Sequence, residues 1–125
     1  MKFDDKIPIY YQIKQYIYKE IIINHLTPGS KVPAVRQLAL DLAVNVNTVQ
    51  RSLRELISEG VLESQRGKGN FVTTNPEILN NLRKNIVEEQ LSLMYDHLAS
   101  LQLTPDEMVQ ALTEYVNKRK ETHHG

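Results

Sequence analysis

The stretch that decides the fold is residues 31–72, KVPAVRQLALDLAVNVNTVQRSLRELISEGVLESQRGKGNFV. Its first part predicts a short helix over residues 35–42, because apolar residues follow the i, i+3, i+4, i+7 spacing of one buried face: Val35, Leu38, Ala39 and Leu42. Polar residues occupy the other face, among them Arg36, Gln37 and Asp41.

A second helix is predicted after a break of about three residues. Asn45 suits the N-cap, because its side chain can accept from an unpaired N–H group of the following turn. The helix is expected over residues 46–59, and Gly60 can adopt the left-handed conformation that ends it. Its predicted buried stripe is Val49, Leu53, Leu56 and Ile57. Two short helices joined by a tight turn are typical of a helix-turn-helix.

A basic hairpin is predicted directly after the second helix. Residues 61–65 and 69–73 are expected to form two strands joined by Arg66-Gly67-Lys68-Gly69, whose glycines permit positive φ in the turn. A hairpin in this place is typical of the wing of a winged helix-turn-helix.

Upstream of this stretch, residues 8–25 predict one more helix. Isoleucine recurs there at every fourth position, at Ile9, Ile13, Ile17 and Ile21. The following Pro28-Gly29 pair suits the two central positions of a type II turn.

Downstream, two helices are predicted beyond Asn75-Pro76, which reads as an N-cap followed by proline in the first turn. The first is expected to reach about Leu101. The second starts at the capping box Thr104-Pro105-Asp106-Glu107. It is expected to continue to about Lys120 and to bury Met108, Val109, Leu112, Tyr115 and Val116. The predicted fold is therefore mainly α. A winged helix-turn-helix domain over residues 1–75, with three helices and a two-stranded wing, precedes a two-helix dimerisation element over residues 76–125.

Composition narrows the class of protein. The net charge is zero, but residues 1–74 hold 10 Lys/Arg against 7 Asp/Glu, and the tail carries the opposite excess. This asymmetry favours a polyanion as the partner of the first part. There is no cysteine, and neither a signal peptide nor a membrane span is predicted. The histidines lack metal-ligand spacing, and the terminal His123–His124 pair is expected to fray. We therefore expect a cytoplasmic protein with no metal, no cofactor and no membrane partner.

Residues 8–73 resemble the DNA-binding head of the GntR family of bacterial transcription regulators. The matching pieces are PAVRQLA at 33–39, VNTVQR at 46–51, EGVLE at 59–63 and RGKG at 66–69, preceded by PIYYQI at 8–13. The short tail is similar to that of the YtrA branch. Departures at Ala34, Ala43 and Gln50, where serine, glycine and arginine are common, bear on the operator sequence rather than on the fold.

The resemblance implies which residues contact DNA. Arg36 is assigned to a phosphate or a guanine edge. Asn47, Thr48 and Gln50 lie at the end of the helix that enters the major groove, and Asn45 either joins them or only caps. Arg51 and Arg54 are expected to clamp the backbone, or else to pair with Glu55 or Glu59. At the wing, the expected minor-groove contacts are Arg66, Lys68 and Gly69.

The tail carries two apolar stripes that a single chain cannot cover. They are Leu79, Leu82, Ile86 and Leu93, and beside them Val87, Leu91, Met94 and Leu98. We expect one of them to form a homodimer interface, the alternative being a monomer whose tail folds flat on residues 8–25.

We expect a transcription regulator, and specifically a repressor, that binds a palindromic double-stranded DNA operator as a homodimer. An enzyme is the first rival, and the sequence lacks a Ser/His/Asp set, a phosphate loop and a zinc motif. A winged helix used for protein–protein assembly is the second, and the basic wing argues against it. A small-molecule effector is a further partner that the sequence allows without identifying.

Overall fold

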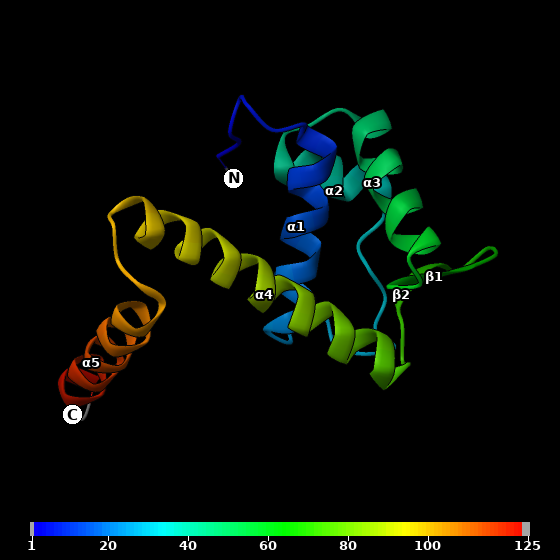
Figure 1. The fold of residues 1–125 in the computed structure, drawn as a ribbon. Helices are drawn as coiled ribbons and strands as arrows, with labels where there is room; N and C mark the ends of the chain where they lie inside the picture. The colour runs from blue at the N-terminus through cyan, green and yellow to red at the C-terminus, as the bar shows by residue number, and fades with distance from the viewer. Residues whose placement is uncertain (1, 124–125) are drawn as a thin grey trace. The chain divides into compact units, whose positions relative to one another are not determined.

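The computed structural model describes residues 2–123, so His124 of the predicted frayed pair lies outside the described range. The chain divides into two compact units, Met1–Arg83 and Lys84–Gly125. In chain order (Figure 1) the elements are α1 (Ile9–Ile22), α2 (Val35–Leu42), α3 (Val46–Ser58), β1 (Leu62–Gln65), β2 (Gly69–Val72), α4 (Pro76–Ser100) and α5 (Pro105–His123). The predicted fold class, a winged helix-turn-helix followed by two helices, is confirmed.

The core of the first unit lies between α1 and α3. The apolar side chains there are Ile13, Ile17, Val49, Leu53 and Leu56, none more than 2% exposed. Each such burial contributes about 1.5–3 kcal/mol before conformational entropy is subtracted. The isoleucine repeat therefore marks the core face of α1, except at Ile9, which is 44% exposed because it begins the helix.

The end of α1 lies three residues before the predicted end. Asn24 adopts φ +64°, a left-handed conformation that asparagine tolerates better than most residues. The N–H groups of His25 and Leu26 then donate to the carbonyl of Glu20, at 2.9 and 3.0 Å, and close the helix. The predicted type II turn is supported by Gly29 at φ +80° and by a 3.0 Å bond from the Ser30 N–H to the Thr27 carbonyl.

The turn between α2 and α3 is tight. Ala43 ends α2 with φ +55° and ψ +50°, in the left-handed region. Two residues later the Asn45 Oδ1 atom accepts from the Asn47 N–H at 2.7 Å and caps α3. Alanine at position 43 costs about 1–2 kcal/mol relative to a right-handed conformation, because its Cβ crowds the backbone.

We predict that Ala43→Gly stabilises the protein by about 0.5–1 kcal/mol, since glycine removes this crowding. Ala39→Gly, in the interior of the same helix, is the matched control and should destabilise by about 1 kcal/mol. Urea unfolding measures both. A loss of stability in Ala43→Gly would show that the turn is not strained.

The wing is a two-stranded antiparallel hairpin whose register pairs Leu62 with Val72 and Gln65 with Gly69. The other edge of β2 is covered by the segment before α2. The Val32 N–H donates to the Asn70 carbonyl at 2.8 Å, and the Val72 N–H donates to the Ser30 carbonyl at 2.9 Å. The sequence did not predict this pairing, which ties the wing to the start of α2.

The division between the two units falls inside α4, after Arg83. Leu82 is buried in the first unit, and Leu79 is half-buried and lines a small hollow with Ile21 and Ile22. The first two turns of α4 thus pack with the head, eight residues beyond the boundary drawn from the sequence.

The second unit holds the rest of α4 and all of α5. The capping box is confirmed, because the Thr104 N–H donates to Glu107 Oε1 at 2.9 Å and the Glu107 N–H donates to Thr104 Oγ1 at 3.2 Å. Both bonds lower the pKa of Glu107, and the bond from the Thr104 backbone has the larger effect. Of the five residues that α5 was expected to bury, only Met108 is buried in the single chain, so the prediction is wrong for Val109, Leu112, Tyr115 and Val116. One neighbouring helix covers too little of the surface of α5.

Across residues 2–123, no helix has the length and apolar content needed to span a membrane.

Candidate nucleic-acid interface

The amino end of α3 presents polar side chains to solvent. Asn47 and Gln50 are exposed and Thr48 is half-buried. Asn45 is also exposed, but its side-chain oxygen is engaged in the cap, which supports the capping role that the sequence left open. The exposed amides of Asn47 and Gln50 can each donate and accept, as a base edge requires.

Basic side chains lie on two further elements of the first unit. Arg36 is exposed on α2, whereas Leu38 and Leu42 face the core. Arg66 and Lys68 are exposed at the end of the hairpin, where Gly67 takes φ +76°. Figure 1 shows this hairpin projecting beyond the carboxyl end of α3.

Gly69 has a structural role that the sequence did not reveal. Its φ is +114°, and a Cβ atom added there would lie 2.9 Å from Lys31 Cε. The lysine side chain therefore crosses directly over the glycine and adds a basic residue beside β2, apart from Arg66 and Lys68.

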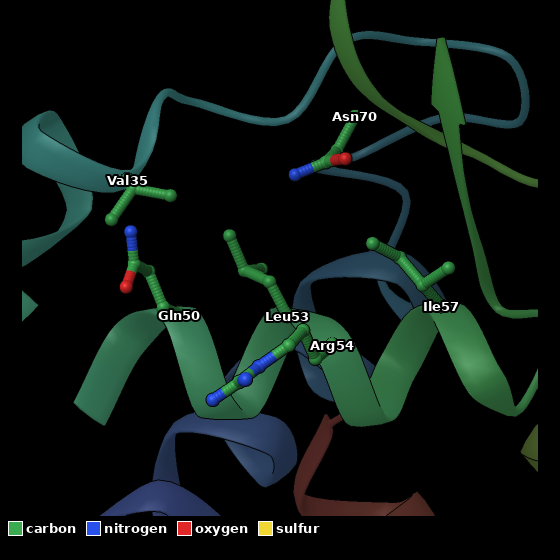
Figure 2. Close-up of a pocket in the computed structure, with 6 residues that line it drawn as sticks. All are labelled: Val35, Gln50, Leu53, Arg54, Ile57 and Asn70. Carbon is green, nitrogen blue, oxygen red and sulfur yellow. The ribbon is translucent and has the colours of Figure 1, made fainter. Parts of the chain in front are cut away.

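A hollow of about 340 Å³ lies between α2, α3 and the wing, and we call it the α3–wing hollow. Figure 2 shows Gln50, Leu53 and Ile57 rising from α3, with Asn70 of β2 pointing toward them across the hollow, and Arg54 lying across the near face of the helix. Val35, at the start of α2, completes the lining. Val35 and Ile57, both expected in the core, are half-buried because they line this hollow. Asn70 was missed, because a polar residue inside a short strand gives no signal of its own.

Family comparison agrees with this geometry. Residues 9–72 match the family model described as bacterial regulatory proteins, gntR family. The chain belongs to the GntR family. It is accordingly a DNA-binding transcriptional regulator, and its relatives by sequence are regulators.

Two Bacillus subtilis relatives extend the match into the tail. One is the uncharacterized HTH-type transcriptional regulator YhcF, 33% identical over 91% of this chain and 94% of its own length. The other is the HTH-type transcriptional repressor YtrA, 36% identical over 75% of this chain and 68% of its own. Both support the predicted YtrA-like organisation.

Solved structures agree. A GntR family transcriptional regulator from Listeria monocytogenes has a TM-score of 0.83 and 29% identity over 90% of this chain and 98% of its own. The DNA-binding domain of AraR in complex with operator ORR3 has a TM-score of 0.53 and 29% identity, covering 58% of this chain and 88% of that one.

In this GntR-family chain, Arg51 is held by the protein itself. Its guanidinium lies 3.6 Å from the centroid of the Tyr10 ring, and its Nε donates to Glu55 Oε2 at 3.4 Å. This arrangement matches the alternative in which Arg51 pairs with Glu55. Tyr10 was not predicted to take part, because the contact joins residues far apart in sequence.

Lys14 links α1 to α3 and was also missed. The residue is 8% exposed, and its Nζ lies 3.0 Å from Glu55 Oε1 and 2.6 Å from Glu59 Oε2. Burial lowers the pKa of Lys14, but the bonds to Glu59 and Glu55 outweigh it and raise the pKa above its usual value. The Lys14 bond lowers the pKa of Glu55, and burial with a hydrogen bond to Glu59 raises the pKa of Tyr18.

We predict that Lys14→Met destabilises the protein by roughly 1–2 kcal/mol at neutral pH. The estimate is well below that for a fully buried pair, because the Glu55 and Glu59 side chains remain 35% and 36% exposed. Lys19→Met, on the exposed side of α1, is the control and should change stability by less than about 0.5 kcal/mol.

The loss should depend on pH. A carboxyl whose pKa is lowered in the folded state contributes stability above its unfolded pKa and loses it as the pH falls through the folded value. The difference between Lys14→Met and the wild type should therefore shrink below about pH 4.3, the ordinary glutamate pKa. Denaturant unfolding at neutral and acid pH measures it, and an equal difference at both would show that the ion pairs contribute nothing.

Proposed function

We propose that this regulator is a cytoplasmic, homodimeric repressor that binds a palindromic operator, with α3 in the major groove and the wing at the adjacent minor groove. The observation that carries the proposal is the exposed polar amino end of α3, with Asn47 and Gln50, in the same compact unit as the exposed Arg66 and Lys68 of the wing. The AraR domain, whose fold is similar, has been solved with its operator, and the relative YtrA is a repressor.

The tail supports the dimer. Its apolar side chains remain uncovered in the single chain, with Leu91 50%, Val109 67% and Val116 42% exposed. An apolar hollow of about 270 Å³, which we call the tail hollow, lies between α4 and α5 and is lined by Leu91, Met94, Tyr95, Leu98, Pro105, Met108, Val109 and Leu112. We assign this hollow to side chains of a second copy, because a symmetric interface buries the same patch on both chains.

Of the tail residues expected at the dimer interface, we assign the main contribution to those in the second unit. Leu82 is already buried and Leu79 half-buried in the first unit, so neither offers much surface to a partner. Ile86, Met94 and Leu98 are half-buried, whereas Val87, Leu91 and Leu93 are each 50% exposed. We therefore expect Val87, Leu91 and Leu93, together with the exposed apolar residues of α5, to form most of the dimer interface.

The direct test is genome-wide capture of bound DNA followed by footprinting. A two-fold dimer requires two inverted half-sites centred about one helical turn, or a multiple of it, apart. Protection of a single asymmetric half-site would overturn the dimeric model, and recovery of no enriched sequence would overturn specific binding.

The proposed residue roles predict two kinds of effect on DNA binding: a loss of affinity for all sequences and a loss of preference at one base pair. Arg36→Ala and Lys68→Ala should weaken binding to all sequences and reduce the slope of log K against log salt by about 1 per contact. Asn47→Ala and Gln50→Ala should instead relax preference at one base pair, by about 1–3 kcal/mol. Lys118→Ala, on exposed α5, is the charge-matched control and should change neither quantity. Fluorescence anisotropy with the captured operator and its point variants measures both, and a uniform loss in all four variants would refute the assignment of base readers.

We also predict that Leu91→Glu combined with Leu112→Glu converts the dimer to a monomer. Each substitution places a charge in the proposed interface and removes about 1.5–3 kcal/mol of apolar burial per side chain. Ser92→Glu combined with Gln110→Glu adds the same charge at exposed polar positions of the same helices and should leave the dimer intact. Sedimentation should give the 14.4 kDa chain mass for the first variant and twice that for the control. A dimer that survives the leucine substitutions would place the interface elsewhere.

A further inference from the structure

Two arginines lie three residues apart on α3, and among the described residues only one of them contacts other side chains of the protein in an ion pair. Arg51 stacks on Tyr10 and pairs with Glu55. Arg54 is exposed, takes part in no ion pair within residues 2–123, and lines the α3–wing hollow. Figure 2 shows its side chain lying across α3, with the guanidinium directed toward the amino end of the helix. The rim of the hollow therefore carries a positive charge with no ion-pair partner among the described residues.

The position of the hollow corresponds to a definite part of a DNA duplex. The sugar–phosphate backbone of one strand separates each major groove from the neighbouring minor groove. If α3 lies in the major groove and the wing reaches the adjacent minor groove, that backbone must cross the space between α3 and the wing. The α3–wing hollow occupies this space, since its lining comes from α3 and from Asn70 of β2, with Val35 at the start of α2.

The chemistry of the lining fits such an occupant. Arg54 and the Asn70 amide supply donors for phosphate oxygens. Val35, Leu53 and Ile57 supply an apolar floor that suits the carbon face of a deoxyribose. The Asn70 backbone is fixed by the sheet, because its carbonyl accepts from the Val32 N–H at 2.8 Å, so its side chain is presented from a rigid strand.

We propose that the α3–wing hollow holds one sugar–phosphate unit of each operator half-site, with Arg54 and Asn70 as the two donors to its phosphate. The inference rests on the proposed function and adds Asn70 to the DNA contacts. The contact fixes the register of α3 on the duplex, which leaves Gln50, on the same side of the helix, to meet a base edge.

The test uses the full chain and operator duplexes in which single phosphates are replaced in turn by uncharged methylphosphonate. For the wild type, neutralising the phosphate between the major-groove and minor-groove contacts should weaken binding about tenfold. Arg54→Ala and Asn70→Ala should each weaken binding to the unmodified duplex by about tenfold, and each should be less sensitive than the wild type to that one neutralised phosphate, Arg54→Ala the less sensitive of the two because the charged donor is gone. Only Arg54→Ala should also lower the salt slope, because asparagine carries no charge.

Asn70→Asp makes the test sharper. It preserves side-chain size but places a carboxylate beside the phosphate, so it should weaken binding more than Asn70→Ala. Neutralising the same phosphate should restore much of the loss. Arg66→Ala, at the wing tip, is the control and should keep full sensitivity at this phosphate. Circular dichroism of each variant checks that the fold is intact.

The outcomes separate the inference from the proposed function. If the wild type binds no captured operator, the proposed function fails. If the wild type binds, but neutralising the phosphate weakens binding equally in Arg54→Ala, Asn70→Ala and the wild type, the proposed function stands. That result would contradict only the proposal that the hollow holds this sugar–phosphate unit. Reduced sensitivity in both variants, with rescue of Asn70→Asp, supports the inference.

Discussion

The packing of α3 against α1 is the interaction on which the rest of the molecule depends. Val49, Leu53 and Leu56 are buried against Ile13 and Ile17, and this contact fixes which side of α3 faces inward. Polar contacts set the same orientation, because the Lys14 ammonium lies between Glu55 and Glu59 and the buried Ser52 hydroxyl bonds to the Tyr10 carbonyl at 2.8 Å. With that side fixed, Asn47, Gln50 and Arg54 can only face outward.

The remaining elements of the head are positioned from α3. The left-handed Ala43 and the Asn45 cap set the turn into the helix, and Gly60, at φ +79°, sets the turn out of it into the wing. The strand-like segment before α2 pairs with β2, so the start of α2 and the wing are joined through one sheet edge. The α3–wing hollow exists because these three elements meet there without filling the space.

Local patterns predicted most of the fold because they report local physics. Helix α2 was predicted at its observed bounds, and α3 and both strands within one residue, since apolar spacing, an N-cap and glycine turns act over a few residues. The end of α1 was placed too late, because the isoleucine repeat does not show that Asn24 turns left-handed. The burial of α5 was wrong, because apolar spacing shows which face a helix would bury but not whether a single chain has anything to cover it.

The sequence predicts candidate DNA contacts only where a residue's role follows from its place in the motif. Arg36, Asn47, Gln50 and Lys68 are exposed, as DNA contact requires. Lys14, Tyr10 and Lys31 were missed, because their partners Glu55, Arg51 and Gly69 lie far along the chain. The same physics distinguishes Arg51 from Arg54: only the folded structure shows that one is held by the protein and the other lines the hollow.

Amide hydrogen exchange, measured by mass spectrometry with and without the captured operator duplex, tests the central claim most directly. The account predicts added protection in the start of α2, in residues 45–54 and in the wing at residues 66–70, because these backbone segments would be covered by DNA. The middle of α1, which packs in the core, should exchange as before. Protection confined to α4 and α5, or absent from both α3 and the wing, would contradict the account.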